Sequence, residues 1–179
     1  MGWTPRIGTQ ALASRLGGER ALRVLAELLR SRVAGPALVH HPWRRVLLDI
    51  GDGHADRLLH DPTGDRLTYW PRAWAARSMA YLADPRARQV LLEAMADEHW
   101  RVRMNATMSL GRLGVGDVTP QLKRALQDAH PRVRQAAVIA LGRVGDDSAV
   151  GVLAAVLRTS GEPAARRVER AIGDIERRT

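Results

Sequence analysis

Apolar residues recur along the chain with the spacing of amphipathic helices. A stripe with i, i+4, i+7 spacing begins at Ala106, and the same stripe begins again at Ala137. This spacing places the apolar side chains on one face of a helix. A shorter stripe, which includes Leu122 and Leu126, lies between the two and predicts a separate, shorter helix. The pattern therefore predicts pairs of helices in which a short helix precedes a longer one.

The helix pairs belong to an internal repeat. Residues 100–114 and 131–145 share Arg, Val, Arg, Ala, Leu, Gly, Arg and Gly at a constant offset of 31 residues, and weaker copies occur one offset earlier and one later. Units of this kind cannot bury their apolar faces alone and have to stack. We expect an all-α, right-handed α-solenoid of five to six antiparallel helical hairpins with a 31-residue period.

One column of the repeat holds only small residues, namely Ala80, Gly111, Gly142 and Gly173. Glycine inside a helix costs about 1 kcal/mol relative to alanine. A glycine that recurs at the same position therefore predicts that neighbouring helices approach each other closely there.

The spacing Asp-x5-Arg, followed by Ala, Leu and Gly, resembles HEAT repeats. It occurs as Asp97 with Arg103 and as Asp128 with Arg134. The 31-residue length is similar to the short HEAT-like units first described in phycobilin lyase subunits, and the resemblance covers about residues 70–178. It implies a solenoid in which these Asp and Arg side chains bond between neighbouring units as a ladder.

The end units depart from this pattern. The last unit has Thr159 and Ala165 at the two ladder positions, so it has lost both partners. The first has Arg66 and Arg72, and would need Asp65 or another acid. Both departures suit units that have only one neighbour. We expect Asp128→Ala to destabilise the fold by leaving Arg134 unpaired in a partly buried turn.

Residues 1–69 are less regular than residues 70–179. A strong amphipathic helix is predicted over 20–33, and another within 36–50, entered or kinked at Pro42. A turn over 51–53 and a short helix over 55–60 follow. We interpret 1–69 as degenerate hairpins that cap the HEAT-like repeats of 70–179 within one continuous domain.

Composition limits the chemistry. Lys and Arg total 28 against 19 Asp and Glu, so the formal net charge is +9, and no cysteine is present. Disulfides, thiolate metal sites and cysteine nucleophiles are thereby excluded. No apolar run approaches the length of a membrane span, and residues 1–30 lack the apolar core of a signal peptide. We expect a cytoplasmic protein.

The face of each second helix opposite its apolar stripe is expected to line a concave groove. Arginine and aromatic residues gather there, which suits an anionic partner. Whether the tryptophans line this groove or fill the core is left open by the sequence. The expected binding residues are Trp74, Arg77, Tyr81, Asn105, Met108, Arg112, Arg143, Arg167 and Arg170, with Arg101 and Arg132 at helix starts.

Catalytic signatures are weak. Histidines 40, 41, 54 and 60 cluster with aspartates 49, 52, 56 and 61, but over irregular turns and with no two histidines at i, i+4 spacing, so we expect no metal and no cofactor. Some HEAT-like proteins are DNA glycosylases that use tryptophan, arginine and an acid, and Asp174 is the only acid expected in the groove. A small-molecule enzyme that uses Tyr81, Arg77 or Asn105 also stays open. The sequence favours a non-catalytic binding module for an acidic protein surface, with nucleic-acid backbone as the alternative partner.

Overall fold

The computed structural model describes residues 4–33, 35–38, 40–51, 54–59, 68–114 and 117–178, and every regular element in these ranges is helical. The α-helices are α1 (Pro5–Leu16), α2 (Gly18–Arg30), α3 (Arg44–Ile50), α4 (Ala55–Leu59), α5 (Tyr69–Leu82), α6 (Ala87–Ala94), α7 (Trp100–Leu113), α8 (Thr119–Ala125), α9 (Pro131–Val144), α10 (Val150–Arg158) and α11 (Ala164–Glu176). Short 3-10 turns cover Gly35–Leu38 and Asp147–Ala149.

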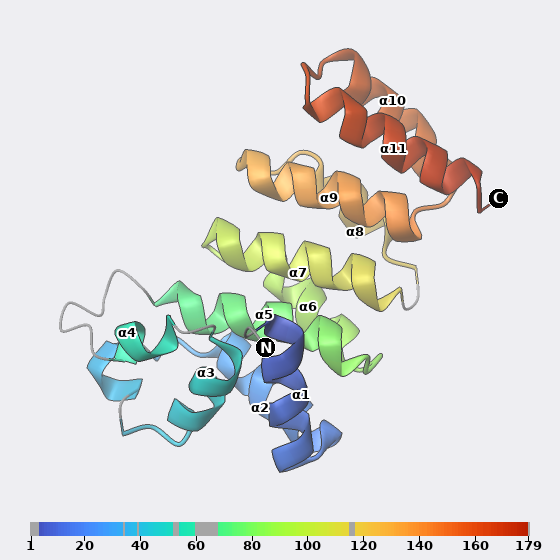
Figure 1. Ribbon diagram of the computed structural model, residues 1–179. Helices are drawn as coiled ribbons and strands as arrows, with labels where there is room; N and C mark the ends of the chain where they lie inside the picture. The colour runs from blue at the N-terminus through green and yellow to red at the C-terminus, as the bar shows by residue number, and fades with distance from the viewer. Residues whose placement is uncertain are drawn as a thin grey trace.

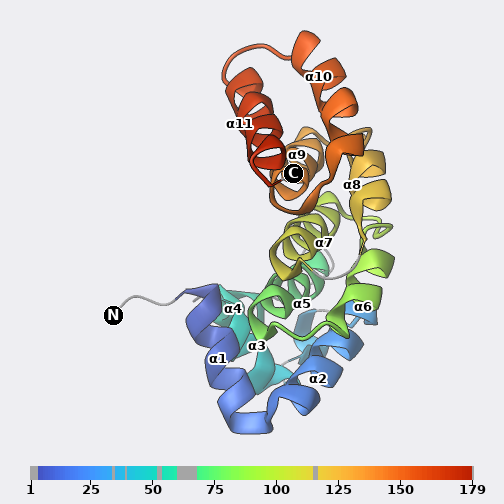
Figure 2. The ribbon, with the colours of Figure 1, turned by 90° about the vertical axis from the view of Figure 1, so that its right-hand side faces the viewer.

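The helices of the second half stack in two layers, which makes the chain an α-solenoid. The short A helices α6, α8 and α10 form one layer, and the longer B helices α5, α7, α9 and α11 form the other (Figure 1). Each B helix packs against the next, and α6, α8 and α10 pack against α7, α9 and α11 respectively. The stack is curved, so that α1 and α11 project beyond α7 and α9 on the same side (Figure 2).

The helices that precede α5, namely α1 to α4, lie at the beginning of this stack, and α1, α2 and α3 pack against α5. Helix α2 lies close to the predicted range, and the leucines expected inside it are buried. The helix predicted within 36–50 is α3, which begins at Arg44, shortly after the proline at which the sequence placed its entry. Helix α1 was not predicted, and it packs against α5. The expected turn over 51–53, the residue His60, and the side chains of Asp65 and Arg66 fall wholly or partly outside the described residues.

Two glycines allow the B helices to approach each other closely. A Cβ atom on Gly111 of α7 would lie 2.6 Å from the Cβ of Ala140 on α9, and one on Gly142 would lie 2.9 Å from the Cα of Ala171 on α11. Both distances are shorter than side chains tolerate, so only glycine fits at these positions. The close approach that the small-residue column predicted is confirmed.

Ion pairs that we call rungs link the units at their loop ends. Arg72 donates from Nε to Asp97 at 2.9 Å, and Arg103 donates in the same way to Asp128 at 2.7 Å. Each pair spans 25 residues and joins one B helix to the loop before the next. The side chain of Arg72 is only 1% exposed. Charge-assisted pairs of this kind are stronger than neutral hydrogen bonds.

The rungs correct two details of the expected ladder. Asp128 pairs with Arg103 of the preceding unit, so Arg103, and not Arg134, would lose its carboxylate in Asp128→Ala. Arg72 needs no acidic residue in its own unit, because it donates to the carboxylate of Asp97 in the next unit. Each aspartate also accepts a hydrogen bond from the backbone two residues later, as Asp128 does from His130 N at 2.8 Å. A rung therefore fixes both the register of two units and the conformation of a loop.

The glycine contact can be tested by adding one methyl group. We expect Gly111→Ala to lower the free energy of unfolding by about 1–3 kcal/mol, because the added Cβ overpacks the α7–α9 interface. A Cβ atom on Gly151 of α10 would have nothing within 4 Å. Gly151→Ala should instead stabilise by about 0.5–1 kcal/mol through helix propensity. Urea unfolding of both variants measures the difference, and a stabilised Gly111→Ala would contradict the close approach.

The rung can be tested against the equivalent arginine one unit later. Arg103 and Arg134 both donate from Nη1 to two carbonyls of their own loop, but only Arg103 also binds a carboxylate. We expect Arg103→Gln to cost about 1–3 kcal/mol of unfolding free energy and Arg134→Gln about 0.5 kcal/mol or less. Thermal unfolding compares them, and equal costs would mean that the carboxylate contributes nothing.

Candidate functional site

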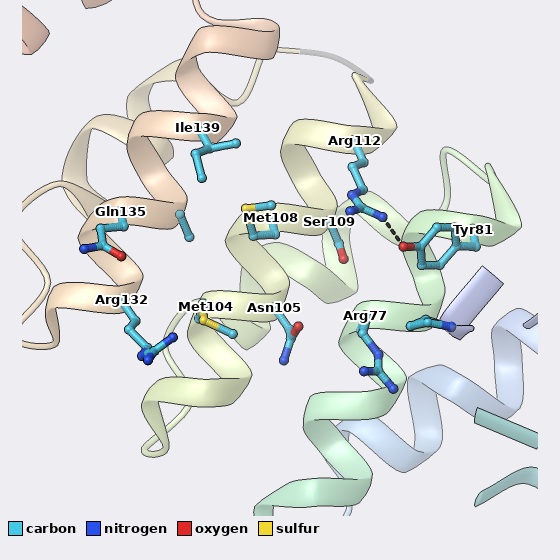
Figure 3. Close-up of a pocket in the computed structure, with 12 residues that line it drawn as sticks. Arg77, Tyr81, Met104, Asn105, Met108, Ser109, Arg112, Arg132, Gln135 and Ile139 are labelled. Atoms are coloured by element: carbon cyan, nitrogen blue, oxygen red, sulfur yellow. Dashed lines mark hydrogen bonds between the residues drawn. The ribbon is translucent and has the colours of Figure 1, made fainter. Parts of the chain in front are cut away.

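The B helices carry an open cleft of about 380 Å³. Side chains from α5, α7 and α9 converge on it, as Figure 3 shows. Three arginines surround an apolar floor that two methionines and Ile139 provide. The residues that line it are Pro5, Arg77, Tyr81, Met104, Asn105, Met108, Ser109, Arg112, Arg132, Gln135, Ala136 and Ile139.

A second cleft continues the first toward α11. It has a volume of about 310 Å³ and shares Ile139 with the first cleft, and Arg143, Arg167 and Arg170 line it. We call the two clefts together the B-face groove. Its lining contains six arginines and one acid, Asp174, whose carboxylate accepts a hydrogen bond from Arg177 at 2.6 Å. The groove therefore carries a strong excess of positive charge.

Neighbouring side chains orient the arginines at the α5 end of the groove. Arg112 donates to the Tyr81 hydroxyl, and its guanidinium carbon lies 5.0 Å from the centre of the Tyr81 ring. Arg77 donates to the carbonyl of Ile50 at 3.1 Å. Arg143 and Arg132, further along the groove, are exposed. Neighbouring side chains or carbonyls thus hold two of the six groove arginines, and the other four, Arg132, Arg143, Arg167 and Arg170, are exposed.

The structure contradicts one expected groove residue. Trp74 is only 2% exposed and belongs to the core, and its ring lies against the position of Gly51 at the end of α3. On α7 the equivalent position, Asn105, lines the groove. The difference arises because α1 and α3 pack across α5 and cover there the face that stays open on α7. Trp74 is therefore a packing residue.

Aromatic rings stack across the starts of the B helices. His99 lies 3.4 Å from Tyr69, centre to centre, and His130 lies 3.9 Å from Trp100, both with nearly parallel rings. Each histidine also caps the next helix, because its Nδ1 atom accepts a hydrogen bond from the backbone two residues later. Arg101 does not line either cleft; its guanidinium lies 4.3 Å from the Trp100 ring centre and close to two further rings.

A histidine Nδ1 atom can accept a capping hydrogen bond only while it carries no proton. Burial, together with the positive charge of Arg101, lowers the pKa of His99 below its usual value. The neutral form of the His99 side chain therefore prevails near neutral pH, and this is the form that the cap requires. The Asp-x-His spacing before each of these two B helices is the signal in the sequence that could have predicted the caps.

Several groove residues were not expected from the sequence. Met104 and Gln135 lie one position before Asn105 and Ala136 and widen the lined face, and Ser109 lies one position after Met108. The helical spacing could have suggested all three. Pro5 comes from α1, whose position against α5 had no signal in the repeat.

The described residues also bear on whether the chain has groups that could hold a metal ion or helices that could span a membrane. Among the described residues, no group of three or more histidine, aspartate or glutamate side chains is placed to hold a metal ion. Asp49, from the expected cluster, pairs instead with Arg15 at 2.5 Å and with Arg45 at 3.3 Å. No helix in the part of the chain that the structure describes is long and apolar enough to cross a membrane.

Comparison with known proteins agrees with the repeat architecture. A family model described as HEAT repeats matches residues 66–123 and again residues 108–173. A search of curated proteins finds no match for the chain. The two family matches together extend from α5 into α11, and so over the B helices that line the groove.

The histidine cap makes a prediction about pH. Because the fold lowers the pKa of His99, the unfolded chain binds that proton more tightly. The stabilisation is complete above the usual histidine pKa of about 6.5 and is lost as pH falls through the lowered value. His99→Asn retains a capping acceptor that does not titrate. We expect the melting temperature of this variant to fall less than that of the wild type between about pH 7.5 and pH 5; equal slopes would contradict the cap.

Proposed function

This chain belongs to the HEAT-repeat family, and we propose that it is a binding module whose B-face groove holds an acidic segment of a protein partner. Repeats of this family commonly mediate interactions between proteins, and solenoids use extended concave surfaces for this purpose. The observation that carries the proposal is the charge of the groove lining, in which six arginines face one acid.

The charge supports an anionic partner because the arginines follow the whole groove. Arg77, Arg112 and Arg132 line its first cleft, and Arg143 lies in the second. Arginine binds carboxylates through paired hydrogen bonds and is enriched among the residues that contribute most to binding. An extended segment with several aspartates or glutamates could meet these guanidinium groups one after another.

The floor of the groove favours a protein segment over nucleic acid. Met104, Met108 and Ile139 provide an apolar surface between the arginines. Methionine side chains adapt to differently shaped apolar partners. A phosphate backbone has no apolar side chains to fill such a floor, whereas an acidic peptide with leucine or phenylalanine does. Nucleic-acid backbone stays the second candidate, because the net charge of +9 would attract it.

A titration with defined probes tests the proposal. The probes are a labelled peptide of alternating Asp and Leu, the same peptide with Asn for Asp, and a labelled DNA duplex, each followed by fluorescence anisotropy at several salt concentrations. We expect saturable binding of the Asp peptide only. The double variant Arg112→Glu, Arg143→Glu should weaken it about tenfold or more, which corresponds to roughly 1.4 kcal/mol.

The control is a second double reversal outside the groove. Arg20 of α2 and Arg124 of α8 are exposed and line neither groove cleft. Arg20→Glu, Arg124→Glu changes the net charge equally and should retain peptide binding. An equal loss of peptide affinity in both double variants would mean that the peptide is held by a general attraction between opposite charges and not by the groove. Duplex binding with a steep linear fall of log affinity against log salt, without peptide binding, would replace the proposal with the nucleic-acid alternative.

A further inference from the structure

The rungs end one unit before the helices do. Arg72 pairs with Asp97 and Arg103 with Asp128, so the next rung would join Arg134 to residue 159. That residue is Thr159, whose hydroxyl donates to the carbonyl of Val156 at 3.1 Å. The arginine of the third rung is therefore present, and its acid is missing.

Arg134 is held in the position that a rung requires. Its Nη1 atom donates to the carbonyls of Asp128 and Ala129 at 2.8 and 3.0 Å, as Nη1 of Arg103 does to Asp97 and Glu98 at 2.9 and 3.0 Å. In Arg103, Nε and Nη2 then bind the carboxylate. Within the described residues, Nε and Nη2 of Arg134 have no hydrogen-bond partner.

A cleft lies where the acid is missing. It measures about 460 Å³ between α9 and α11 and is lined by both Arg134 and Thr159. The corresponding cleft one unit earlier contains Asp128, is not lined by Arg103, and measures about 290 Å³. The cleft that lacks the acid is thus larger than the one that contains it, and its volume falls in the range of ligand sites.

The lining of this cleft suits a carboxylate attached to an apolar group. Arg167 adds a second cation, and no aspartate or glutamate lines the cleft. Val138, Val156 and Val168 form apolar walls. A guanidinium that is already oriented loses little entropy when a carboxylate binds to it through two hydrogen bonds.

We propose that this cleft is a carboxylate-binding site, in which an aspartate side chain of a protein partner completes the third rung with Arg134 and the neighbouring apolar side chains of that partner contact the valines. The rungs within the chain supply the template for this contact, since each joins an arginine to an aspartate on a separate loop. Arg167 lines both this cleft and the second cleft of the B-face groove, but the contact proposed here is made by Arg134, which, like Thr159, lines neither groove cleft, so the proposal does not rest on the groove.

The first experiment restores the missing acid in the chain itself. Thr159→Asp should form the third rung and raise the melting temperature by about 2 °C or more over Thr159→Asn, which has the same shape without the charge. In proton–nitrogen NMR spectra the Nε–Hε signal of Arg134 should move toward that of Arg103. An unchanged signal together with an unchanged melting temperature would overturn the proposal, because Arg134 would then not be positioned for a carboxylate.

The second experiment supplies the acid from outside. The tripeptide acetyl-Leu-Asp-Leu-amide, its Asn counterpart and acetate are titrated into the wild-type protein while the Arg134 and Arg103 signals are followed. We expect a saturable shift of Arg134 with the Asp peptide, none with the Asn peptide, and at least tenfold weaker binding of acetate. Arg103 should not move, because Asp128 already occupies it, and Thr159→Asp should abolish the shift of Arg134.

The alternative outcomes are also decisive. Equal shifts with the Asp and Asn peptides would show that no carboxylate is recognised. Acetate that binds as tightly as the Asp peptide would assign the site to small free carboxylates and overturn the protein partner. Arg112→Glu, Arg143→Glu should leave the Arg134 titration unchanged, so a failure of the groove proposal and a failure of this one can be told apart.

Discussion

The whole structure depends on the contact between successive B helices. No helix pair can cover its own apolar face, so each unit relies on the next for its core. Gly111 and Gly142 allow α7, α9 and α11 to approach closely enough to exclude water, and the rungs fix which residues meet. Once these helices lie side by side, the faces that they turn away from the core form a continuous surface. The B-face groove is therefore a by-product of how the core is built.

Much of this architecture could be predicted because it repeats. The spacing of Ala106, Leu110 and Leu113 gives a helix and its buried face, and the glycine column gives the helix contact. Helix α1 gave no such signal, because Gly8, Thr9 and Leu12 on its buried face form no apolar stripe. The partner of Asp128 also needed the structure. The motif fixes which side chains can pair, but only the stacking decides that Arg103 reaches it.

The candidate groove was predictable to the extent that it follows the repeat. Asn105, Met108 and Arg112 lie on the face that the spacing assigned to them, because α7 has the same neighbours as an ideal unit. Trp74 was misplaced because its neighbours are α1 and α3, which have no counterpart elsewhere in the repeat. Sequence periodicity thus locates a surface reliably in the middle of an array. It fails at the end, where other elements cover the same face.

The loss of the acid at Thr159 also bears on how the molecule opens. In a linear array, stability is a sum of unit terms and of terms for each junction between neighbours. The junctions closed by Asp97 and Asp128 carry an ion pair, whereas among the residues that the structure describes none joins α9 to α11 or to the loop before it. The α10–α11 hairpin is therefore joined to α9 without a rung at its loop end, while at its other end Arg178 donates to the carbonyls of Gly142 and Gly145. The backbone amide hydrogens of this hairpin should exchange with solvent through local opening. Those of α7 should exchange only when the whole array unfolds.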